Sequence, residues 1–322
     1  MKMLKRLSAL LTAVAIITLT SCQTKKTFSG DAGTFPDMSG MMPVVDITQP
    51  TAAPTGASTL AELPADSYKT ALTYCVDTDR FSQQKDIDKR IYPASMTKFL
   101  TAYTALRYVK PETKFKVGSE LDMVQPESSL CLIQKGNVLT LYDLLTGLMI
   151  MSGNDAAYTV AVGTARLLRP KDKLSDRQAV KYFCELMNKT AAEIGMNDSS
   201  FVNPDGWDDS KQYTTAADLL TLTKQAIKNQ TIKKIISIKE TKVTLSAGGS
   251  LNWKNHIKLI DPKSPYYCKD FIGGKTGTTD SAGYCLISVF EKNGKTYIII
   301  VTGCKDDNSR NAAALDLYKR IK

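Results

Sequence analysis

Segments with the pattern of β-strands lie at both ends of residues 66–322, and segments with helical periodicity lie between them. The predicted strands cover residues 68–76, 235–245, 270–275, 284–290 and 297–303. One predicted helix follows Pro93, and the others cover residues 140–149, 156–168, 176–194, 216–227 and 308–322. This order predicts an α+β fold in which strands from both chain ends share one antiparallel sheet beside a helical cluster.

Local signals support several of these elements. Apolar residues recur on one face of the helix after Pro93, namely Met96, Phe99, Leu100, Tyr103 and Leu106. Thr140 and Asp143 have the spacing of a capping box at the start of the next helix. Asn293-Gly294 separates the last two predicted strands and is a strong hairpin signal.

Residues 1–21 have the features of an export signal. Lys2, Lys5 and Arg6 precede an apolar stretch that is of signal-peptide length and short for a transmembrane helix. The stretch ends at Ser21-Cys22, which resembles a bacterial lipobox. We therefore expect a lipoprotein signal peptide whose removal leaves lipidated Cys22 as the N-terminus. Ordinary cleavage nearby, with Cys22 unmodified, is the alternative.

The remaining chain divides by composition into two parts. Residues 22–65 are rich in Thr, Ser, Pro, Gly and Ala, which predicts a flexible, lipid-anchored tether. Residues 66–322 have the length and pattern of a folded catalytic domain. Two acyl chains on Cys22 would hold the protein stably at a membrane, so we expect an extracytoplasmic, membrane-anchored location.

Charge and cysteine content limit the classes of partner and cofactor. The formal net charge is +10, but the chain has no dense Lys/Arg block and no nucleic-acid motif, so we expect no nucleic-acid partner. His256 is the single histidine, which makes a cysteine–histidine zinc site unexpected, and we predict no metal or organic cofactor. Several cysteines lie in apolar runs and are predicted to be buried thiols, with one disulfide as the alternative.

A serine with a lysine base is the first candidate catalytic pair. The surroundings of His256 contain no nucleophile elbow, so a serine–histidine–aspartate mechanism is not expected. Pro93 marks a helix start, which predicts Ser95 in the first turn, where free N–H groups favour negative charge. Lys98 lies three residues on and shares that helix face. A buried lysine loses proton affinity and can act as a base near neutral pH.

Two further short motifs follow along the chain. Ser152-x-Asn154 lies between two predicted helices, where a loop can place a hydroxyl and a carboxamide in a cleft; a turn with capping residues is the alternative. Lys275-Thr276-Gly277 ends a predicted strand. Small residues there let a substrate backbone pair along the strand, and the lysine offers a cation for a carboxylate. A glycine-rich turn is the alternative.

The order of the three motifs is more specific than any one of them. The chain contains other matches, Ser82-x-x-Lys85, Ser250-x-Asn252 and Ser309-x-Asn311, which we expect to be structural or surface residues. Only one set occurs in order, each in a suitable setting, after an export signal. This set resembles the motif triplet of β-lactamases and penicillin-binding proteins.

Longer segments narrow the resemblance to one family. Residues 93–98, 152–157, 195–196, 201–206, 213–218 and 273–279 resemble the low-molecular-weight D-Ala-D-Ala carboxypeptidases, a family of penicillin-binding proteins. The resemblance covers roughly residues 66–322. It implies the β-lactamase/DD-peptidase-like fold, with the site between a sheet and a helical cluster.

The resemblance also implies roles for individual residues. Ser95 would be the acylated nucleophile, Lys98 its base, and Ser152 the proton relay to the leaving D-alanine. The implied substrate-binding residues are Asn154, Lys275, Thr276, Gly277, Thr278 and Arg310. Among them, Asn154 would bind the substrate amide, Lys275 and Thr276 would bind the carboxylate and polarise Ser152, and Arg310 would help bind the terminal carboxylate. The N–H groups of Ser95 and Thr278 would form the oxyanion hole.

The implied activity is removal of the terminal D-alanine from peptidoglycan stem peptides, with β-lactam antibiotics as covalent inhibitors. Three alternatives stay open: a class A-like β-lactamase, a DD-endopeptidase, and a non-catalytic penicillin-binding sensor lipoprotein. The β-lactamase is disfavoured because no Glu-x-x-Leu-Asn segment lies between Asn154 and Lys275. Two departures from the family are Gln212, where histidine is frequent, and a chain end at Lys322, so we expect the N-terminal lipid to replace a C-terminal membrane anchor.

Overall fold

The computed structural model describes residues 67–245 and 248–322. The predicted signal peptide, Cys22 and the whole of the predicted tether lie outside the described residues. Within the described ranges, every helix is too short or too polar to span a bilayer. The six described cysteines are all buried and carry free thiols, as predicted: Cys75, Cys131, Cys184, Cys268, Cys285 and Cys304.

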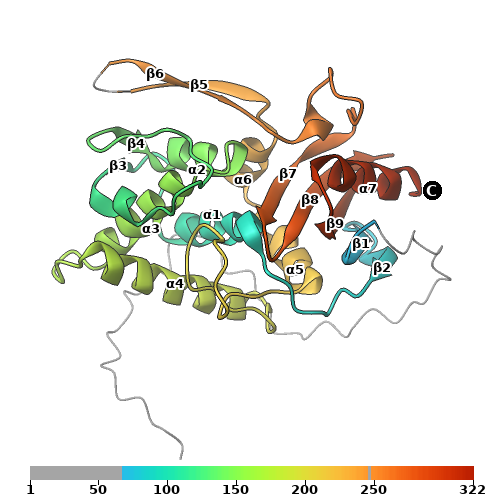
Figure 1. Ribbon diagram of the computed structural model, residues 1–322, viewed down its shortest axis with the longest axis horizontal. Coiled ribbons are helices and arrows are strands. Elements are labelled where there is room, and N and C mark those ends of the chain that lie inside the picture. Colours follow the sequence, from blue (N-terminus) through green and yellow to red (C-terminus); the bar gives the residue numbers. More distant parts are fainter. Residues whose placement is uncertain (1–66, 246–247) are drawn as a thin grey trace, which may run out of the picture. The chain divides into compact units, whose positions relative to one another are not determined.

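A five-stranded sheet joins the two ends of the described chain (Figure 1). Its strands are β1 (Thr70–Cys75), β2 (Arg80–Lys85), β7 (Phe271–Thr279), β8 (Gly283–Lys292) and β9 (Lys295–Cys304). The order is β2-β1-β9-β8-β7, and all neighbours are antiparallel. The predicted α+β fold, with terminal strands in one sheet, is therefore confirmed.

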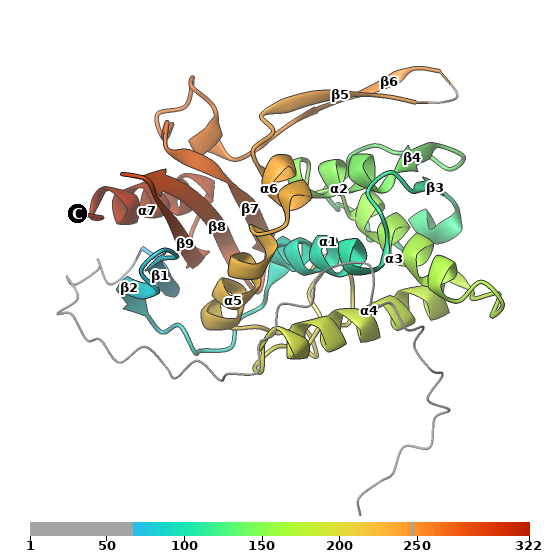
Figure 2. The ribbon, with the colours of Figure 1, turned by 180° about the vertical axis from the view of Figure 1, so that it is seen from behind.

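Seven helices complete the described fold. They are α1 (Thr97–Tyr108), α2 (Leu141–Ile150), α3 (Asn154–Leu168), α4 (Asp176–Glu193), α5 (Ala216–Ala226), α6 (Gln230–Ile236) and α7 (Asp307–Lys319). Helix α7 covers one face of the sheet in Figure 1, and Figure 2 shows α1 and α5 on the side of the other face.

Strand β9 shows how one sheet serves two cores. Ile298 and Ile300 belong to the core that includes the helical cluster, whereas Ile299 and Val301 belong to the core under α7. Successive side chains of a strand point to opposite faces, so a continuous apolar run is required when both faces are covered. The run 298–301 is completely buried.

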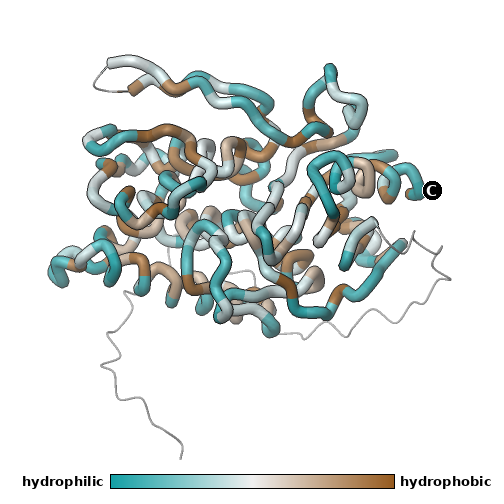
Figure 3. Tube along the Cα trace, viewed as in Figure 1, coloured by the Kyte–Doolittle hydropathy of each residue, from teal (hydrophilic) through white to brown (hydrophobic). Residues whose placement is uncertain are grey.

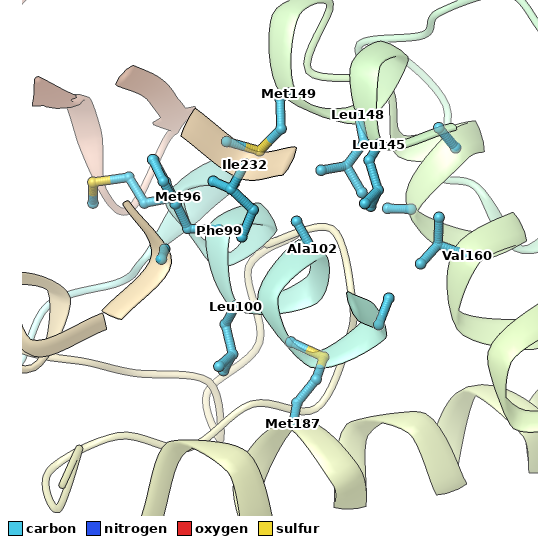
Figure 4. Packing of buried hydrophobic residues seen from close by; sticks show 14 of the residues in the cluster. Met96, Phe99, Leu100, Ala102, Leu145, Leu148, Met149, Val160, Met187 and Ile232 are labelled. Atoms are coloured by element: carbon cyan, nitrogen blue, oxygen red, sulfur yellow. The ribbon is translucent and has the colours of Figure 1, made fainter. Parts of the chain in front are cut away.

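Helix α1 lies at the centre of the helical cluster. Figure 4 shows its side chains Phe99, Leu100 and Ala102 pointing in different directions toward α2, α4 and α6. Phe99 and Leu100 are fully buried. Each such side chain contributes about 1.5–3 kcal/mol through removal from water, so α1 is held firmly beside the sheet.

Two local predictions are confirmed in detail. Thr140 and Asp143 form a reciprocal capping box at the start of α2. Asn293 and Gly294, between β8 and β9, have φ values of 53° and 71°. These values suit a two-residue hairpin turn whose twist matches that of the flanking strands.

The predicted strand at 235–245 is wrong over its first half. Ile235 and Ile236 end helix α6, and the strand β5 covers only Glu240–Thr244. The side chain of Asn229 accepts hydrogen bonds from the N–H groups of Thr231 and Ile232 and so caps α6. This cap and the burial of the α6 isoleucines against neighbouring elements thus favour a helix over an extended strand. The last helix also ends at Lys319 rather than at residue 322.

Several elements were missed by the sequence analysis. One is the sheet strand β2, at residues 80–85. The others are shorter: β3 (Lys114–Lys116), β4 (Val138–Thr140), β6 (Ser250–Lys254) and the 3₁₀ turns η2 (Ser119–Met123) and η3 (Lys258–Ile260). Strands β5 and β6 form a separate ribbon above α2 in Figure 1, with mixed hydrophilic and hydrophobic residues in Figure 3. Trp253 fixes the base of this ribbon, because its indole N–H donates to the Cys131 carbonyl at 2.8 Å.

Candidate active site

The three sequence motifs meet where strand β7 approaches the start of α1. They border a pocket of about 420 Å³ whose lining includes Ser95, Ser152, Thr276, Thr278 and Arg310. The serines at positions 82, 250 and 309, the other motif matches, do not line this pocket. The fold therefore brings the three predicted motifs together, and the serines of the other motif matches lie outside the pocket.

Ser95 lies in the 3₁₀ turn η1 (Ala94–Met96), which leads into α1. We expected Ser95 in the first turn of the α-helix itself. It lies instead in the tighter 3₁₀ turn that directly precedes α1. Ala94 has a φ of 46°, in the left-handed region that non-glycine residues rarely adopt. Gly206 packs against this turn so closely that a Cβ atom would lie 1.8 Å from the Ala94 carbonyl oxygen. The position of the Ser95 hydroxyl is therefore set by dense backbone packing.

The ammonium group of Lys98 uses all its donors inside the protein. Nζ donates to Ser95 Oγ at 2.8 Å, to Asn154 Oδ1 at 2.7 Å and to the Asp205 carbonyl oxygen at 2.6 Å. Burial lowers the pKa of Lys98 to about 8, although the carboxylates of Asp205 and Asp155 act in the opposite direction. Lys98 can therefore release its proton close to neutral pH and accept one from the adjacent hydroxyl.

Lys275 and Ser152 form a second buried lysine–serine pair. Lys275 Nζ donates to Ser152 Oγ at 2.8 Å and to the Thr276 carbonyl oxygen at 2.8 Å. Burial, followed by the nearby cations Lys98 and Arg310, lowers the pKa of Lys275 well below its usual value. Ser152 has a φ of 59°, which is strained for serine. The strained loop directs its hydroxyl to Lys275.

Asn154 is the first residue of α3 and connects the two sides of the site. Its Oδ1 accepts from Lys98, and its Nδ2 donates to Ser128 Oγ at 2.9 Å. An amide nitrogen carries two protons, so a second donor position remains available for a ligand carbonyl. The backbone N–H of Asn154 donates to the Ser129 carbonyl at 2.8 Å, which fixes the neighbouring loop.

Arg310 places a positive charge in the wall of the pocket. It lies in the first turn of α7 and donates from Nη1 to Thr278 Oγ1 at 2.8 Å and to the Gly277 carbonyl at 3.1 Å. It also pairs with Asp307 at 2.5 Å. The guanidinium group is thus fixed beside the end of β7, where the predicted substrate-binding residues Thr276 and Thr278 border the pocket.

Two buried acidic residues were missed as site residues. Asp155 accepts hydrogen bonds from the N–H groups of Cys131 and Ile133, which fastens the loop that carries Ser128 to α3. Asp205 is 1% exposed, and its Oδ2 has no hydrogen-bond partner among the described residues. Burial raises the pKa of Asp205, and Lys98 lowers it. Both residues lie inside segments that resemble the family, but nothing in their spacing revealed the electrostatic effect of their carboxylates on Lys98.

Two residues outside the predicted set have clear environments. Gln212 is buried, and its side-chain oxygen accepts from the N–H groups of Val202 and Asn203, so it shapes the loop that leads to Asp205. His256 borders the pocket, and burial followed by Lys275 and Lys254 lowers its pKa, which favours the neutral imidazole. No hydrogen bond joins His256 to Ser95 or Ser152 in the described structure.

Comparison with known proteins decides the family. Residues 58–306 match the family described as D-alanyl-D-alanine carboxypeptidase. The chain belongs to this family. It is similar to the D-alanyl-D-alanine carboxypeptidase DacF of Bacillus subtilis, with 28% identity over 247 residues, which cover 76% of this chain and 59% of the relative. It is also similar to a D-alanyl-D-alanine carboxypeptidase of Streptomyces sp., with 30% identity over 273 residues, which cover 80% of this chain and 84% of the relative. The chain thus spans less than two thirds of the Bacillus relative.

A solved structure agrees with this membership of the D-alanyl-D-alanine carboxypeptidase family. The crystal structure of a Streptomyces DD-transpeptidase has a TM-score of 0.72 and 26% sequence identity. The similarity covers 80% of this chain and 98% of that chain. The predicted β-lactamase/DD-peptidase-like fold is therefore confirmed.

The close packing of Gly206 on the Ser95 turn predicts an unusual cost for a single methyl group. Gly206→Ala would place a Cβ against the Ala94 carbonyl as well as impose a φ of 93° on alanine. Gly195→Ala is a matched control, because Gly195 has a φ of 91° with nothing within 4 Å of its added Cβ. We expect urea unfolding to show a loss of about 1–2 kcal/mol for the control and at least about 2 kcal/mol more for Gly206→Ala. Equal losses would contradict the packing argument.

Proposed function

We propose that the protein is a serine D-alanyl-D-alanine carboxypeptidase that removes the terminal D-alanine from peptidoglycan stem peptides through an acyl-enzyme on Ser95. The single observation that carries this proposal is the 2.8 Å contact between Ser95 Oγ and Lys98 Nζ, with the pKa of Lys98 lowered to about 8 by burial. Family membership and the names of the relatives support the substrate class.

In the acylation step, the neutral amine of Lys98 takes the proton of Ser95 as Oγ attacks the carbonyl of the penultimate D-alanine. The N–H groups of Ser95 and Thr278 would stabilise the oxyanion. The peptide C–N bond then breaks, and Ser152 donates its proton to the leaving amine. The hydrogen bond from Lys275 to Ser152 supports this relay, because it can return a proton to the serine.

Before deacylation, Lys98 releases the proton that it took from Ser95, as its pKa of about 8 allows, and Lys275 regains the proton that it gave to Ser152. In the deacylation step, water attacks the ester carbonyl and gives its proton to Lys98, the ester bond breaks, and Lys98 passes that proton to Ser95. Lys98 is the base placed to activate that water, because its amine is adjacent to the ester oxygen. The residues that line the pocket include no acidic side chain. This feature argues against β-lactamase-type deacylation by a glutamate. It supports the view that β-lactams act as covalent inhibitors whose ester with Ser95 is hydrolysed slowly.

Recognition of the substrate would use the pocket walls on both sides of Ser95. Asn154 Nδ2 would donate to the substrate amide, and Gly277 lets the substrate backbone lie along β7. Arg310 and the hydroxyls of Thr276 and Thr278 would take the terminal carboxylate. Lys275 is 1% exposed and already donates twice, so its cation supports this carboxylate through the local potential and through Ser152.

A second activity shares the acyl-enzyme. The similar crystal structure is that of a DD-transpeptidase. In a transpeptidation, an amine takes the place of water as the acceptor of the acyl group. Hydrolysis and transfer differ only after acylation, so the same residues would serve both. The ratio of free acid to transferred product, measured with an added acceptor amine, separates the two.

The expected outcome for the nucleophile is complete dependence of turnover on Ser95. The full-length protein should release D-alanine from a peptide that ends in D-Ala-D-Ala, and Ser95→Ala should reduce the rate by at least about 10³-fold. Ser82→Ala is the matched control, because Ser82 belongs to the other Ser-x-x-Lys match and lies outside the pocket. Penicillin labelling of Ser95 without D-alanine release would point to a sensor or to an enzyme restricted to cross-linked substrate. If penicillin does not label the protein and no D-alanine is released, the proposal is rejected.

The environment of Lys98 predicts the pH dependence of acylation. Only the neutral amine can accept the serine proton, so the rate of labelling by fluorescent penicillin should rise with pH through about 8, the pKa of Lys98. Asp205→Asn removes a negative charge that favours the ammonium form. It should therefore move this rise to lower pH by roughly one unit.

Asp198→Asn is the matched control for that profile, because Asp198 is exposed and pairs with Arg90 outside the pocket. Its profile should match that of the unmodified protein. A structural role for Asp205 alone would reduce the labelling rate at every pH without moving the rise. That result would contradict the electrostatic account.

We also propose that residues 66–322 form the catalytic domain of a lipoprotein, held by lipidated Cys22 through the tether at 22–65. The apolar run before Ser21-Cys22 supports the lipid anchor, and the family match over residues 58–306 supports the catalytic domain, although the match begins within the last residues of the proposed tether. Cys22→Ser should move the protein from the membrane fraction to the soluble fraction while D-alanine release is retained. Unchanged membrane association, or an N-terminal peptide without lipid mass, would reject the anchor.

A further inference from the structure

A second pocket adjoins the proposed active site. It has a volume of about 510 Å³ and shares Asn255, His256 and Ile257 with the pocket that contains Ser95. The segment 254–266, which includes η3, forms most of its wall, and Asn308 at the start of α7 completes it. Arg310 borders the first pocket one half-turn further along the same helix. The two cavities are therefore neighbouring parts of one cleft.

Lysine side chains dominate the charge of this second pocket. Its lining contains Lys254, Lys258 and Lys263, with Asp261 as the acidic residue in the lining. We call it the basic pocket. Lys254 pairs with Asp261 at 3.2 Å, and Lys258 pairs with Asp307 at 2.7 Å.

Lys263 has no acidic partner in the part of the chain that the structure describes. Its side chain is exposed, and only its backbone N–H contacts Asp261, at 3.1 Å. Arg310, which lines the adjoining first pocket, adds a further cation to the cleft. The basic pocket thus keeps an excess of positive charge, which attracts anionic groups of a ligand that passes along the cleft.

The location of the basic pocket relative to Ser95 limits what can reach it. The groups proposed to take the terminal carboxylate, Thr276, Thr278 and Arg310, all lie in the first pocket with Ser95. A leaving D-alanine ends at that carboxylate and has no atoms to place further along the cleft. Only a leaving group longer than one amino acid would extend past His256 into the basic pocket.

We propose that the basic pocket binds the carboxylates of a peptide leaving group, as presented by a cross-linked pair of stem peptides. This inference rests on the proposed function of the Ser95 centre and extends it to cleavage of cross-links. The Ser95 ester forms on the D-alanine carbonyl of one peptide, and the amide bond to the second peptide breaks. The released amine takes its proton from Ser152, and water then hydrolyses the ester.

The decisive experiment compares two substrates in steady-state kinetics with the full-length protein. One is a single peptide ending in D-Ala-D-Ala, and the other is a cross-linked peptide whose leaving strand carries free carboxylates. The double variant Lys254→Gln/Lys263→Gln should raise KM for the cross-linked peptide about tenfold, because two cations near a carboxylate are lost. Its kcat/KM for the single peptide should stay within about twofold of the unmodified protein.

Two controls make the comparison specific. Lys110→Gln/Lys181→Gln removes the same charge from lysines outside both pockets and should change neither substrate. A cross-linked peptide with amidated carboxylates should show a high KM that the basic-pocket variant does not change. Equal effects on both substrates, or no effect on the acidic cross-linked peptide, would overturn the proposal.

Binding separates failure of the basic pocket from failure of the proposed function. The isolated acidic leaving strand, labelled with a fluorophore, should bind the Ser95→Ala variant in an anisotropy titration and lose about tenfold in affinity with the two lysine substitutions. This loss would support the basic pocket even if the unmodified protein released no D-alanine. Absence of binding that depends on these lysines would overturn the inference even if D-alanine release were observed.

Discussion

The active site depends on the burial of two lysine ammonium groups, Lys98 and Lys275, between the sheet and the helices. Removal of an ammonium from water costs several kcal/mol, so each buried lysine requires polar partners in fixed positions. The partners of Lys98 come from three separate segments, namely Ser95 in η1, Asn154 in α3 and the Asp205 carbonyl. The buried ammonium of Lys98 is therefore stabilised only when η1, α3 and the 201–206 loop are placed correctly relative to one another. The same burial lowers the pKa of both lysines, so both can carry protons.

Positive charge would make this site unstable if no acidic residue lay near it. Asp205 and Asp155 supply that balance without bordering the pocket that contains Ser95. Asp155 also satisfies backbone N–H groups of the 131–133 segment, so one carboxylate shapes the wall and moderates the potential. Asp205 has an oxygen without a hydrogen-bond partner among the described residues, which is costly in a buried site and is explained by its effect on Lys98. The acidic residues thus act on the reaction through the lysine rather than through the substrate.

Periodicity and motif order predicted those features that depend on local sequence. The strands β8 and β9, the capping box of Thr140 and the grouping of the three motifs all follow from short-range patterns. The last two residues of α6, Ile235 and Ile236, were mistaken for the start of a strand, because burial by tertiary neighbours outweighs the β-propensity of isoleucine. The Asp205 carbonyl and the Ser128 partner of Asn154 left no sequence signal, because any residue offers a carbonyl and the contact forms only when distant segments meet.

The position of β1 between β2 and β9 has a consequence for when the enzyme can become active. Thr70 and Thr302 share a hydrogen bond across 232 residues of chain, and β1 lies between β2 and β9. A chain that emerges from its N-terminus, from a ribosome or through a membrane pore, therefore offers β1 only its hairpin partner until almost all residues are out. A two-stranded hairpin alone is marginal in water, and such non-local pairing is slow to form. The buried lysine pairs, and with them any reactive serine, would consequently appear late in biogenesis, which separates synthesis and export of the chain from the onset of its chemistry.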